Sequence, residues 1–515
     1  MRSTGVLAVT ALALAPATAH AFCGFYVAGS NQPMFNDATQ VVLMRQGTRT
    51  VLSMQNNYKG PPDAFAMVIP VPVVLHEGDV KTLAKDVFSH VEQMGAPRLV
   101  EYWEQDPCRP PMPQEPMMMP SGVAMAVDKD EGAAIGGGVK VEARFNVGEY
   151  QIVILSAKDS TGLETWLRDQ KYNIPAGAEP LLRPYVESGS KFFVAKVDPS
   201  KVAFENGRAA LSPLRFYYDA DEFSLPIRLG VANSSGTQDL IVNILAPNQR
   251  YEVANYDDVT VPTNLDVTPN VKDKFGAFYT ALFDATLAKH PGAVVTEYAW
   301  QATTCDPCPG PNLDQGDFLT LGADVLGGPA GHPTRYDNQD FVLTRLHARY
   351  AKDVKNDLVF RQASPIVGGR EFVQSGGQLE QGARADTVNN FQARYAIRHP
   401  WTGPITCDKP ARGVWGGPPT GQQIASGPIA ATNLAFAPRT GVQLASAVPK
   451  GIPELGLASG VSQASSPATP TPAEPTTYAP TQPVKTGCGC DGSGDPRGLL
   501  AIVSLVGLAL VRRRS

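Results

Sequence analysis

The C-terminal end of the chain limits where a folded domain can lie. From residue 416 the sequence is rich in Gly, Ala, Ser, Thr and Pro, and residues 465–483 contain little else. Such a composition cannot bury an apolar core, so residues 416–487 are predicted to form a disordered tether. The tether is followed by Cys488-Gly-Cys490, an apolar run over residues 499–511 and a terminal Arg-Arg-Arg-Ser. The folded part is therefore expected between the N-terminal segment and residue 415.

The last segment, residues 488–515, has the order of a sorting tag. The three arginines stay on the cytoplasmic side of a bilayer, which leaves both thiols on the exported side. The apolar run is shorter than the ~20 residues that span a membrane comfortably. The segment resembles the MYXO-CTERM signal of myxobacterial surface proteins, in which the cysteine motif is the processing point and the tail is removed. This resemblance implies processing at Cys488 and Cys490; an ordinary single-pass tail anchor is the alternative.

The N-terminus predicts export. Residues 1–21 have a basic residue at position 2, an apolar stretch over residues 6–15 and Ala-His-Ala at the end, which is the pattern of a secretory signal peptide. Cleavage is expected between Ala21 and Phe22. A lipoprotein anchored at Cys23 is rejected because Phe22 is too bulky for the position before the modified cysteine. The protein is expected to be exported and membrane-associated, at the cell surface or outer envelope after C-terminal processing.

Charge excludes one class of partner. Residues 22–487 hold 39 basic and 47 acidic side chains, a net charge of −8. Such a surface repels phosphate backbones, so nucleic acid is not expected as a partner. The expected partners are the membrane, the sorting machinery and an unidentified envelope ligand or protein.

Strand patterns dominate residues 22–415, the predicted globular region, which a Pro/Met/Gly-rich insertion interrupts at residues 107–138. Strands are predicted at residues 40–44, 48–56, 64–69, 192–197, 227–231, 240–245, 294–298 and 341–350. Helices are predicted over residues 80–94, after Thr161 as N-cap in a capping box with Glu164, and after Thr268. The third helix carries an apolar stripe and ends near His290. Helices among many strands indicate a strand-rich α+β fold.

A helix–strand–turn order occurs twice. One predicted helix leads to Glu101-Tyr102 and then Asp106-Pro107-Cys108, and another leads to Glu297-Tyr298 and then Asp306-Pro307-Cys308. The spacings differ by several residues. The pattern indicates either a weak internal duplication or a chance similarity.

Motifs that would identify an enzyme are missing from the sequence. It has no Gly-x-Ser-x-Gly, no His-Glu-x-x-His and no phosphate-binding loop, and the six histidines after residue 21 occur singly. Five methionines within residues 112–125 would suit Cu(I) or belong to a disordered insertion. Glu101-Tyr-Trp-Glu104 has the residue types of sugar-binding clefts, but on a strand Glu101 and Glu104 face opposite sides. No catalytic residue, metal ligand or cofactor is therefore predicted.

Five cysteines remain outside the sorting motif, and an odd number leaves at least one unpaired within the chain. Cys305 and Cys308 are predicted to form a disulfide, structural or redox-active, and Cys23 is predicted to pair with Cys108. Cys407 would then be free or intermolecular.

Several motifs together indicate a family. They are the Phe22-Cys23-Gly-Phe-Tyr start and the segments at residues 47–52, 65–72, 101–103, 225–230, 305–308 and 341–346. Over about residues 22–370 the chain resembles the domain of unknown function family 2330, which consists of exported bacterial proteins. The resemblance implies no activity. We expect a binding or structural role in the envelope rather than an enzyme; the alternative is a secreted hydrolase whose site the sequence does not reveal.

Overall fold

The computed structural model describes residues 25–458 apart from gaps at 29–34, 37–39, 56–57, 60–64, 109–138, 175–176, 203, 206–207, 210, 234–235, 328–340, 372, 375–377, 419–426 and 437–440. The described residues belong to the first of two compact units, residues 1–462, and the second unit covers residues 463–515. Several predicted features lie outside the described residues: the predicted signal peptide with Ala21 and Phe22, Cys23, most of the predicted insertion, and the predicted sorting segment with Cys488 and Cys490.

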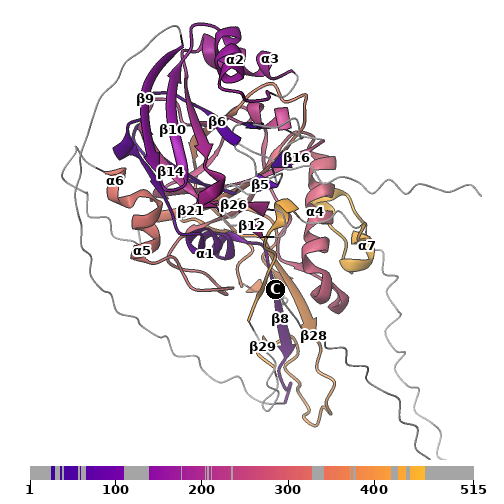
Figure 1. Cartoon of the computed structure of the whole chain (residues 1–515). Helices are drawn as coiled ribbons and strands as arrows, with labels where there is room; N and C mark the ends of the chain where they lie inside the picture. The colour runs from indigo at the N-terminus through magenta and orange to yellow at the C-terminus, as the bar shows by residue number, and fades with distance from the viewer. Residues whose placement is uncertain are drawn as a thin grey trace, which may run out of the picture. The chain divides into compact units, whose positions relative to one another are not determined.

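Two large sheets form the centre of the first unit, and the fold is strand-rich α+β, as predicted (Figure 1). The five-stranded sheet has the order β1 (Phe25–Ala28), β6 (Phe65–Val71), β11 (Lys191–Val197), β10 (Tyr150–Ser156) and β9 (Lys140–Val147). The eleven-stranded sheet has the order β26 (Arg384–Ala385), β23 (Ile366–Gly368), β27 (Asn390–Gln392), β20 (Val294–Gln301), β21 (Phe341–Tyr350), β16 (Gln238–Pro247), β3 (Gln40–Gln46), β4 (Arg49–Gln55), β14 (Leu214–Asp219) and β7 (Val80–Thr82), with β18 (Asp258–Thr260) beside β20.

The two sheets pack face to face. Their inward side chains form one buried cluster, to which β6 and β11 contribute from one sheet and β3, β16 and β21 from the other. Phe193 of β11 stacks on Phe216 of β14 with ring centroids 5.3 Å apart. Burial of these alternating apolar side chains is the main source of stability for such a sandwich.

Helices cover the outer face of each sheet. On the five-stranded sheet lie α2 (Ser160–Asp169) and α3 (Ala178–Glu187), whose Leu163 and Leu182 share a cluster with Val68 and Phe192. On the eleven-stranded sheet lie α1 (Asp86–Gly95) and α4 (Phe275–Lys289), together with α5 (Gln315–Phe318), the π-helical turn η5 (Leu319–Ala323) and α6 (Asp324–Leu326). Since the central strand β21 is covered on both faces, nine of its ten residues are buried.

A third sheet forms a separate group of strands. Its order is β19 (Leu265–Asp266), β28 (Arg394–His399), β8 (Arg98–Glu104) and β29 (Trp415–Gly416), and β30 (Ile429–Ala430) also pairs with β8. We call residues 98–108 and 394–418 the arm. In Figure 1 its strands β8, β28 and β29 run side by side below the other labelled elements.

The remaining elements are short. Small sheets comprise β15 (Ser224–Leu225), β22 (Leu358–Ala363) and β17 (Arg250–Val253); β12 (Phe204–Glu205), β13 (Arg208–Ala209), β5 (Tyr58–Lys59) and β2 (Phe35–Asn36); and β24 (Val373–Gln374) with β25 (Gln378–Leu379). The 3-10 turns are η1 (Glu77–Asp79), η2 (Pro199–Lys201), η3 (Arg228–Asn233), η4 (Pro269–Lys274), η7 (Leu434–Phe436) and η8 (Pro453–Leu455), and α7 is Leu444–Ala447. Among the described helices, none is long and apolar enough to cross a bilayer.

The strand predicted at residues 227–231 is wrong, because this segment forms η3. The carboxylate of Asp357 accepts hydrogen bonds from the backbone N–H groups of Ile227 and Arg228, at 2.8 and 3.1 Å. It also forms an ion pair with the Arg228 side chain at 2.7 Å. These two amides are therefore bonded to a side chain that is distant in sequence, and not to a neighbouring strand.

Two predicted helices begin elsewhere. Residues 80–82 form strand β7 on β14, so the first helix begins only at Asp86. In α2 the N-cap is Asp159 rather than Thr161, because the Asp159 carboxylate accepts the Gly162 N–H at 2.6 Å. The third helix has Thr268 at its N-cap, as predicted, but starts as the 3-10 turn η4 before becoming α4.

The folded part extends past residue 415. Residues 427–458 include β30, η7, α7 and η8, and they bury Leu434, Leu444 and Val448 against α4. Their composition resembles that of a tether, but these widely spaced apolar residues find a partner surface on α4. The predicted start of the tether at residue 416 is therefore too early.

The disulfides confirm one predicted pair and correct the other. Cys305 is bonded to Cys308, as predicted. Cys108 is bonded to Cys407 rather than to Cys23, and their Cα atoms lie 5.5 Å apart. The reason is the parallel pairing of β8 with β28, which brings the segments after both strands to the same end of the arm.

The helix–strand–turn order occurs twice in the structure, as α1–β8 and as α4–β20, each followed by an Asp-Pro-Cys turn. However, β8 lies in the arm sheet and β20 lies in the eleven-stranded sheet. The cysteines of the two turns also have different partners.

Candidate functional site

Strand β8 places its polar residues on two faces of the arm. Side chains alternate along a strand, so Glu101 and Trp103 share one face while Tyr102 and Glu104 share the other. The neighbouring strand β28 is in register, with His399 opposite Trp103. The two acids therefore face opposite sides, as the sequence predicts.

The first face combines stacked rings with an ion pair. The rings of Trp103 and His399 stack with centroids 4.7 Å apart and an angle of 15° between their planes. The Glu101 carboxylate lies 2.9 Å from His399 Nε2 and forms an ion pair with Lys272 of η4. Burial alone raises the pKa of Glu101, but the hydrogen bonds from Lys272 and His399 outweigh it and lower the pKa. This face holds two stacked, partly exposed aromatic rings beside charged side chains of both signs.

On the second face, hydrogen bonds to Glu104 fix the conformation of the arm. Its carboxylate accepts two hydrogen bonds from Arg412, at 2.8 and 2.9 Å, and one each from the backbone N–H groups of Trp401 and Gly413. Arg412 contributes most to a lowered pKa of about 2 for Glu104. The Glu104 side chain thus stays ionised and fixes the backbone after β28 at two points, Trp401 and Gly413.

Tyr102 lies on the same side as Glu104, nearer the body of the fold. The guanidinium of the fully buried Arg394 lies over its ring, 5.2 Å from the centroid, and donates to its hydroxyl. Burial raises the pKa of Tyr102 to about 12, so its hydroxyl stays protonated. This pair anchors the base of the arm.

The end of the arm is closed by a disulfide and presents apolar surface. The Cys108–Cys407 bond joins the segments after β8 and β28. Large apolar side chains that are exposed among the described residues are Val388, Ile405 and Val414, and the last two lie in the arm. Three of the five tryptophans of the chain, Trp103, Trp401 and Trp415, also lie there and are half-buried.

A second polar cluster is buried at the centre of the fold. The carboxylate of Glu297 accepts a hydrogen bond from Arg345 Nε at 2.7 Å and from the Tyr279 hydroxyl at 2.7 Å, and it lies 2.8 Å from His347 Nδ1. Burial raises the pKa of Glu297, but His347 and Arg345 more than offset this effect, and the resulting pKa is about 2. Glu297 and Arg345 have no exposed surface.

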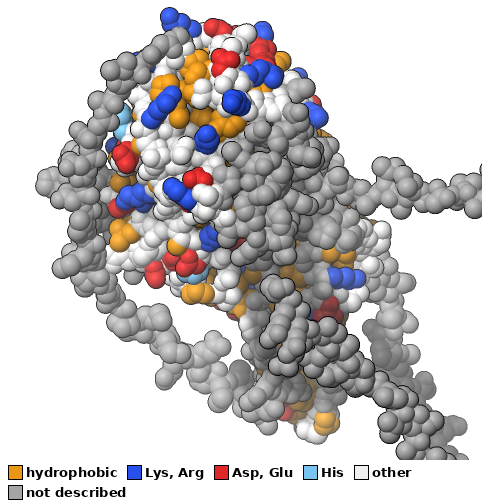
Figure 2. Space-filling model, viewed as in Figure 1, with side chains coloured by type: hydrophobic (Ala, Val, Ile, Leu, Met, Phe, Trp, Pro, Cys, Tyr) orange, Lys and Arg blue, Asp and Glu red, His pale blue; other side chains and the backbone are white. Residues whose placement is uncertain are grey.

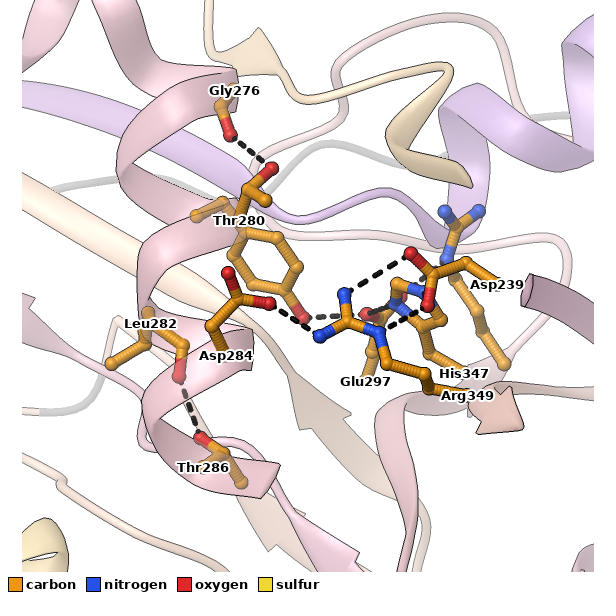
Figure 3. A network of polar contacts seen from close by, with 11 residues as sticks. Asp239, Gly276, Thr280, Leu282, Asp284, Thr286, Glu297, His347 and Arg349 are labelled. Carbon is orange, nitrogen blue, oxygen red and sulfur yellow. Dashed lines mark hydrogen bonds and ion pairs between the residues drawn. The ribbon is translucent and has the colours of Figure 1, made fainter. Parts of the chain in front are cut away.

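The cluster extends towards α4 (Figure 3). Arg349 lies between Asp239 of β16 and Asp284 of α4 and forms ion pairs with both. Phe283 of α4 stacks on His347 with ring centroids 3.7 Å apart. The network therefore ties α4 to β16, β20 and β21, and its burial suits a structural role.

A pocket of about 380 Å³ lies between the start of α4 and residues 441–447. Asn270 and Lys274 line one side, and Val442, Gln443 and Ser446 line the other. Its lining includes no acid and no histidine, and Lys274 is the ionisable side chain among the residues that line it.

The predicted site residues have different outcomes. Cys305 and Cys308 form their disulfide, whereas the processing residues Cys488 and Cys490, the cleavage site and the methionines at 112–125 are outside the described residues. Among the described residues, no cluster of three or more His, Cys, Asp or Glu side chains is placed to hold a metal ion.

Sequence patterns did not identify the residues that complete the arm and the buried Glu297 cluster. His399 and Arg412 lie about 300 residues after their partners Glu101 and Glu104. Glu297 and His347 lie within the long, mostly buried strands β20 and β21. A buried charge in such a strand is the one signal available, because it needs a partner on a neighbouring strand.

A family comparison agrees with the motifs. Residues 16–361 match the model of a bacterial family, DUF2330, described as an uncharacterized protein conserved in bacteria. The chain belongs to the DUF2330 family. The match includes β8 and the Cys305–Cys308 turn, whereas β28 and β29 of the arm follow the matched DUF2330 region. No curated protein and no solved structure matches the chain.

Proposed function

We propose that this protein is exported, is held at the membrane through its C-terminal segment, and binds a glycan of the bacterial envelope through the arm. The observation that carries the proposal is the first face of the arm, where the stacked rings of Trp103 and His399 lie beside Glu101 and Lys272. The flat apolar face of a sugar ring packs well on an aromatic side chain. Its hydroxyl groups need both donors and acceptors, which the ammonium and the carboxylate supply.

The rigidity and the aromatic residues of the arm support a binding role. Binding sites combine rigid aromatic side chains with a few fixed polar groups, and tryptophan is enriched among residues that dominate binding energy. Glu104 and the Cys108–Cys407 bond fix the segments that carry Trp401 and Trp415. A rigid surface loses less conformational entropy when a ligand binds.

The ends of the chain support location in the envelope. The signal-peptide pattern at residues 1–21 directs export, and the motif at Cys488 and Cys490 with the following apolar run would hold the mature chain or its precursor at the membrane. Charged side chains of both signs are mixed over the described face in Figure 2. Such a surface suits a neutral or mixed-charge glycan better than a nucleic acid.

The hydrolase alternative has less support from the described geometry. Glycoside hydrolysis uses two carboxyl groups on either side of one bond, about 5–10 Å apart. Glu101 and Glu104 lie on opposite faces of β8, and each is held by its own cationic partner. We therefore propose binding without cleavage.

Co-sedimentation tests the proposal. Purified protein is mixed with insoluble peptidoglycan sacculi, and the bound fraction is measured for the natural protein and for Trp103→Ala. Loss of a central tryptophan is expected to weaken binding about tenfold or more. Trp166→Ala, on α2, is the matched control and is expected to bind normally.

An intact Cys108–Cys407 bond and an unchanged circular dichroism spectrum would show that the variants are folded. Equal binding by Trp103→Ala and the natural protein, or no sedimentation of either, would refute the proposal.

A further inference from the structure

The two disulfides constrain the chain very differently. Cys108–Cys407 joins residues 299 positions apart, whereas Cys305–Cys308 joins residues three positions apart. The entropy removed from the unfolded chain grows with the logarithm of the loop length, so the short bridge contributes much less to stability. Its location and surroundings therefore suggest another role.

The short bridge is accessible. It lies in the turn between β20 and α5, where Cys308 is exposed and Cys305 is half-buried. A thiolate from another molecule can reach the Cys308 Sγ atom directly, which is the first requirement for thiol–disulfide exchange.

Asn312 places an acceptor beside both sulfur atoms. Its Nδ2 donates to the carbonyl oxygen of Thr303 at 2.6 Å, which turns Oδ1 towards the bridge. Oδ1 lies 2.9 Å from Cys305 Sγ and 3.3 Å from Cys308 Sγ. The carbonyl oxygen of Cys305 is a second acceptor, 3.1 Å from Cys308 Sγ.

These acceptors favour the reduced pair. A disulfide has no S–H group to donate, so its sulfur atoms face oxygen lone pairs. Two thiols would each donate a hydrogen bond to the same oxygens. A dithiol that is stabilised in this way makes its disulfide a stronger oxidant.

The turn is also held independently of its sulfur atoms. The carbonyl oxygen of Pro307 accepts from Arg98 Nη1 at 3.0 Å, and that of Asp306 accepts from Gln392 Nε2 at 2.6 Å. Arg98 and Gln392 are both fully buried. The backbone of the turn can therefore keep its place while the bridge opens and closes.

We propose that Cys305 and Cys308 form an exchangeable pair that oxidises the cysteine pairs of other polypeptides. A substrate thiolate attacks Cys308 Sγ; the substrate–Cys308 bond forms, the Cys305–Cys308 bond breaks, and Cys305 leaves as a thiolate that takes up a proton. The second substrate thiolate then attacks the substrate sulfur of the mixed disulfide and releases Cys308 as a thiol.

Two electrons and two protons pass from the substrate to the pair in this sequence, and the substrate leaves with a disulfide. Exchange with a second disulfide, such as oxidised glutathione, restores the Cys305–Cys308 bond by the reverse steps.

The test measures the redox state of each bridge in the full chain. The protein is equilibrated with graded ratios of reduced to oxidised glutathione, free thiols are trapped by alkylation, and peptides are mapped by mass spectrometry. Cys305–Cys308 is expected to open at ratios that leave Cys108–Cys407 closed. A reduced synthetic peptide with two cysteines is expected to lose two hydrogens in mass when it is mixed with the oxidised protein.

The variant Asn312→Leu tests the positioning role of the amide. Loss of the S–H hydrogen bonds is expected to shift the equilibrium towards the disulfide by roughly fivefold. Asn146→Leu, an exposed position on β9, is the matched control and should not shift it. Opening of both bridges at the same glutathione ratio, no oxidation of the peptide, or an unchanged equilibrium in Asn312→Leu would overturn the proposal.

Discussion

Replacing Glu297 by Gln removes the carboxylate at the centre of the buried network. The carboxylate has three partners, Arg345, His347 and Tyr279, and neither it nor Arg345 has exposed surface. A glutamine keeps the shape of the side chain, but it has one acceptor oxygen instead of two. Its NH₂ group would then point either at Arg345 Nε or at the Tyr279 hydroxyl and His347 Nδ1.

The expected cost follows from the charge that remains. Arg345 would stay buried without a counter-ion, and breaking a buried pair in this way costs about 3–5 kcal/mol. That loss is a large share of a net stability that is typically about 5–15 kcal/mol. A shift of about 1 M or more in the urea midpoint is therefore expected.

Urea titration followed by tryptophan fluorescence and by circular dichroism measures this shift, and coincident curves would justify a two-state treatment. Glu222→Gln is the matched control, because Glu222 is exposed, and it should change stability by no more than about 0.5 kcal/mol. A loss below about 1 kcal/mol in Glu297→Gln would show that the network does not stabilise the fold as argued.

Three further experiments have defined outcomes. Burial raises the pKa of Asp258 to about 6 from an ordinary 3.8, so the ionised side chain destabilises the fold above pH 6 and has no such effect below pH 3.8. Asp258→Asn should therefore raise the free energy of unfolding by about 1–2 kcal/mol at pH 7.5 and leave it unchanged at pH 3.5. Urea titration at both pH values measures this difference. Cys407→Ser opens the long loop and should cost about 3–5 kcal/mol, whereas Cys305→Ser should cost about 2 kcal/mol or less in the same assay. Changing Cys488 and Cys490 to Ser should leave a longer, membrane-retained precursor, and recovery of an intact 499–511 peptide from mature surface protein by mass spectrometry would instead indicate a plain tail anchor.

Local pattern was enough to predict the central strands. Strand β21 has the predicted bounds, and β3, β4, β6, β11, β16 and β20 lie within a few residues of their predicted ranges. These strands are long and apolar because they are covered on both faces, so their identity does not depend on distant residues. The start of η4, the 3-10 turn that leads into α4, was also predictable, since Thr268 and Pro269 mark it locally.

Elements that depend on distant partners were not predictable. The segment at 227–231 is apolar enough for a strand, but Asp357, 130 positions after Ile227, binds its amides. The described residues of 427–458 have a loop-like composition, yet Leu434, Leu444 and Val448 are buried in one cluster with residues of α4. The pairing of Cys108 with Cys407 depends on the parallel pairing of β28 with β8, and no local sequence pattern indicates which strand lies beside β8.

The candidate site was half visible in the sequence. Glu101, Trp103 and Glu104 are adjacent and suggest a sugar-binding surface, and their opposite faces follow from strand geometry. His399 of β28 and Lys272 of η4 complete the face that holds Glu101 and Trp103, whereas Arg412 binds Glu104 on the opposite face. Single basic residues of this kind carry no local signal, so only their contacts in the folded structure reveal them.

Glycan binding by the arm is tested most directly by a fluorescence titration of the natural protein and of Trp103→Ala with soluble peptidoglycan fragments. Trp103 lies on the face that holds Glu101 and Lys272, so a bound sugar would change the emission of the natural protein in a saturable way. The account predicts a saturable change that is absent in Trp103→Ala and preserved in Trp166→Ala. A saturable change of equal size in Trp103→Ala, or no change in the natural protein at any concentration, would contradict it.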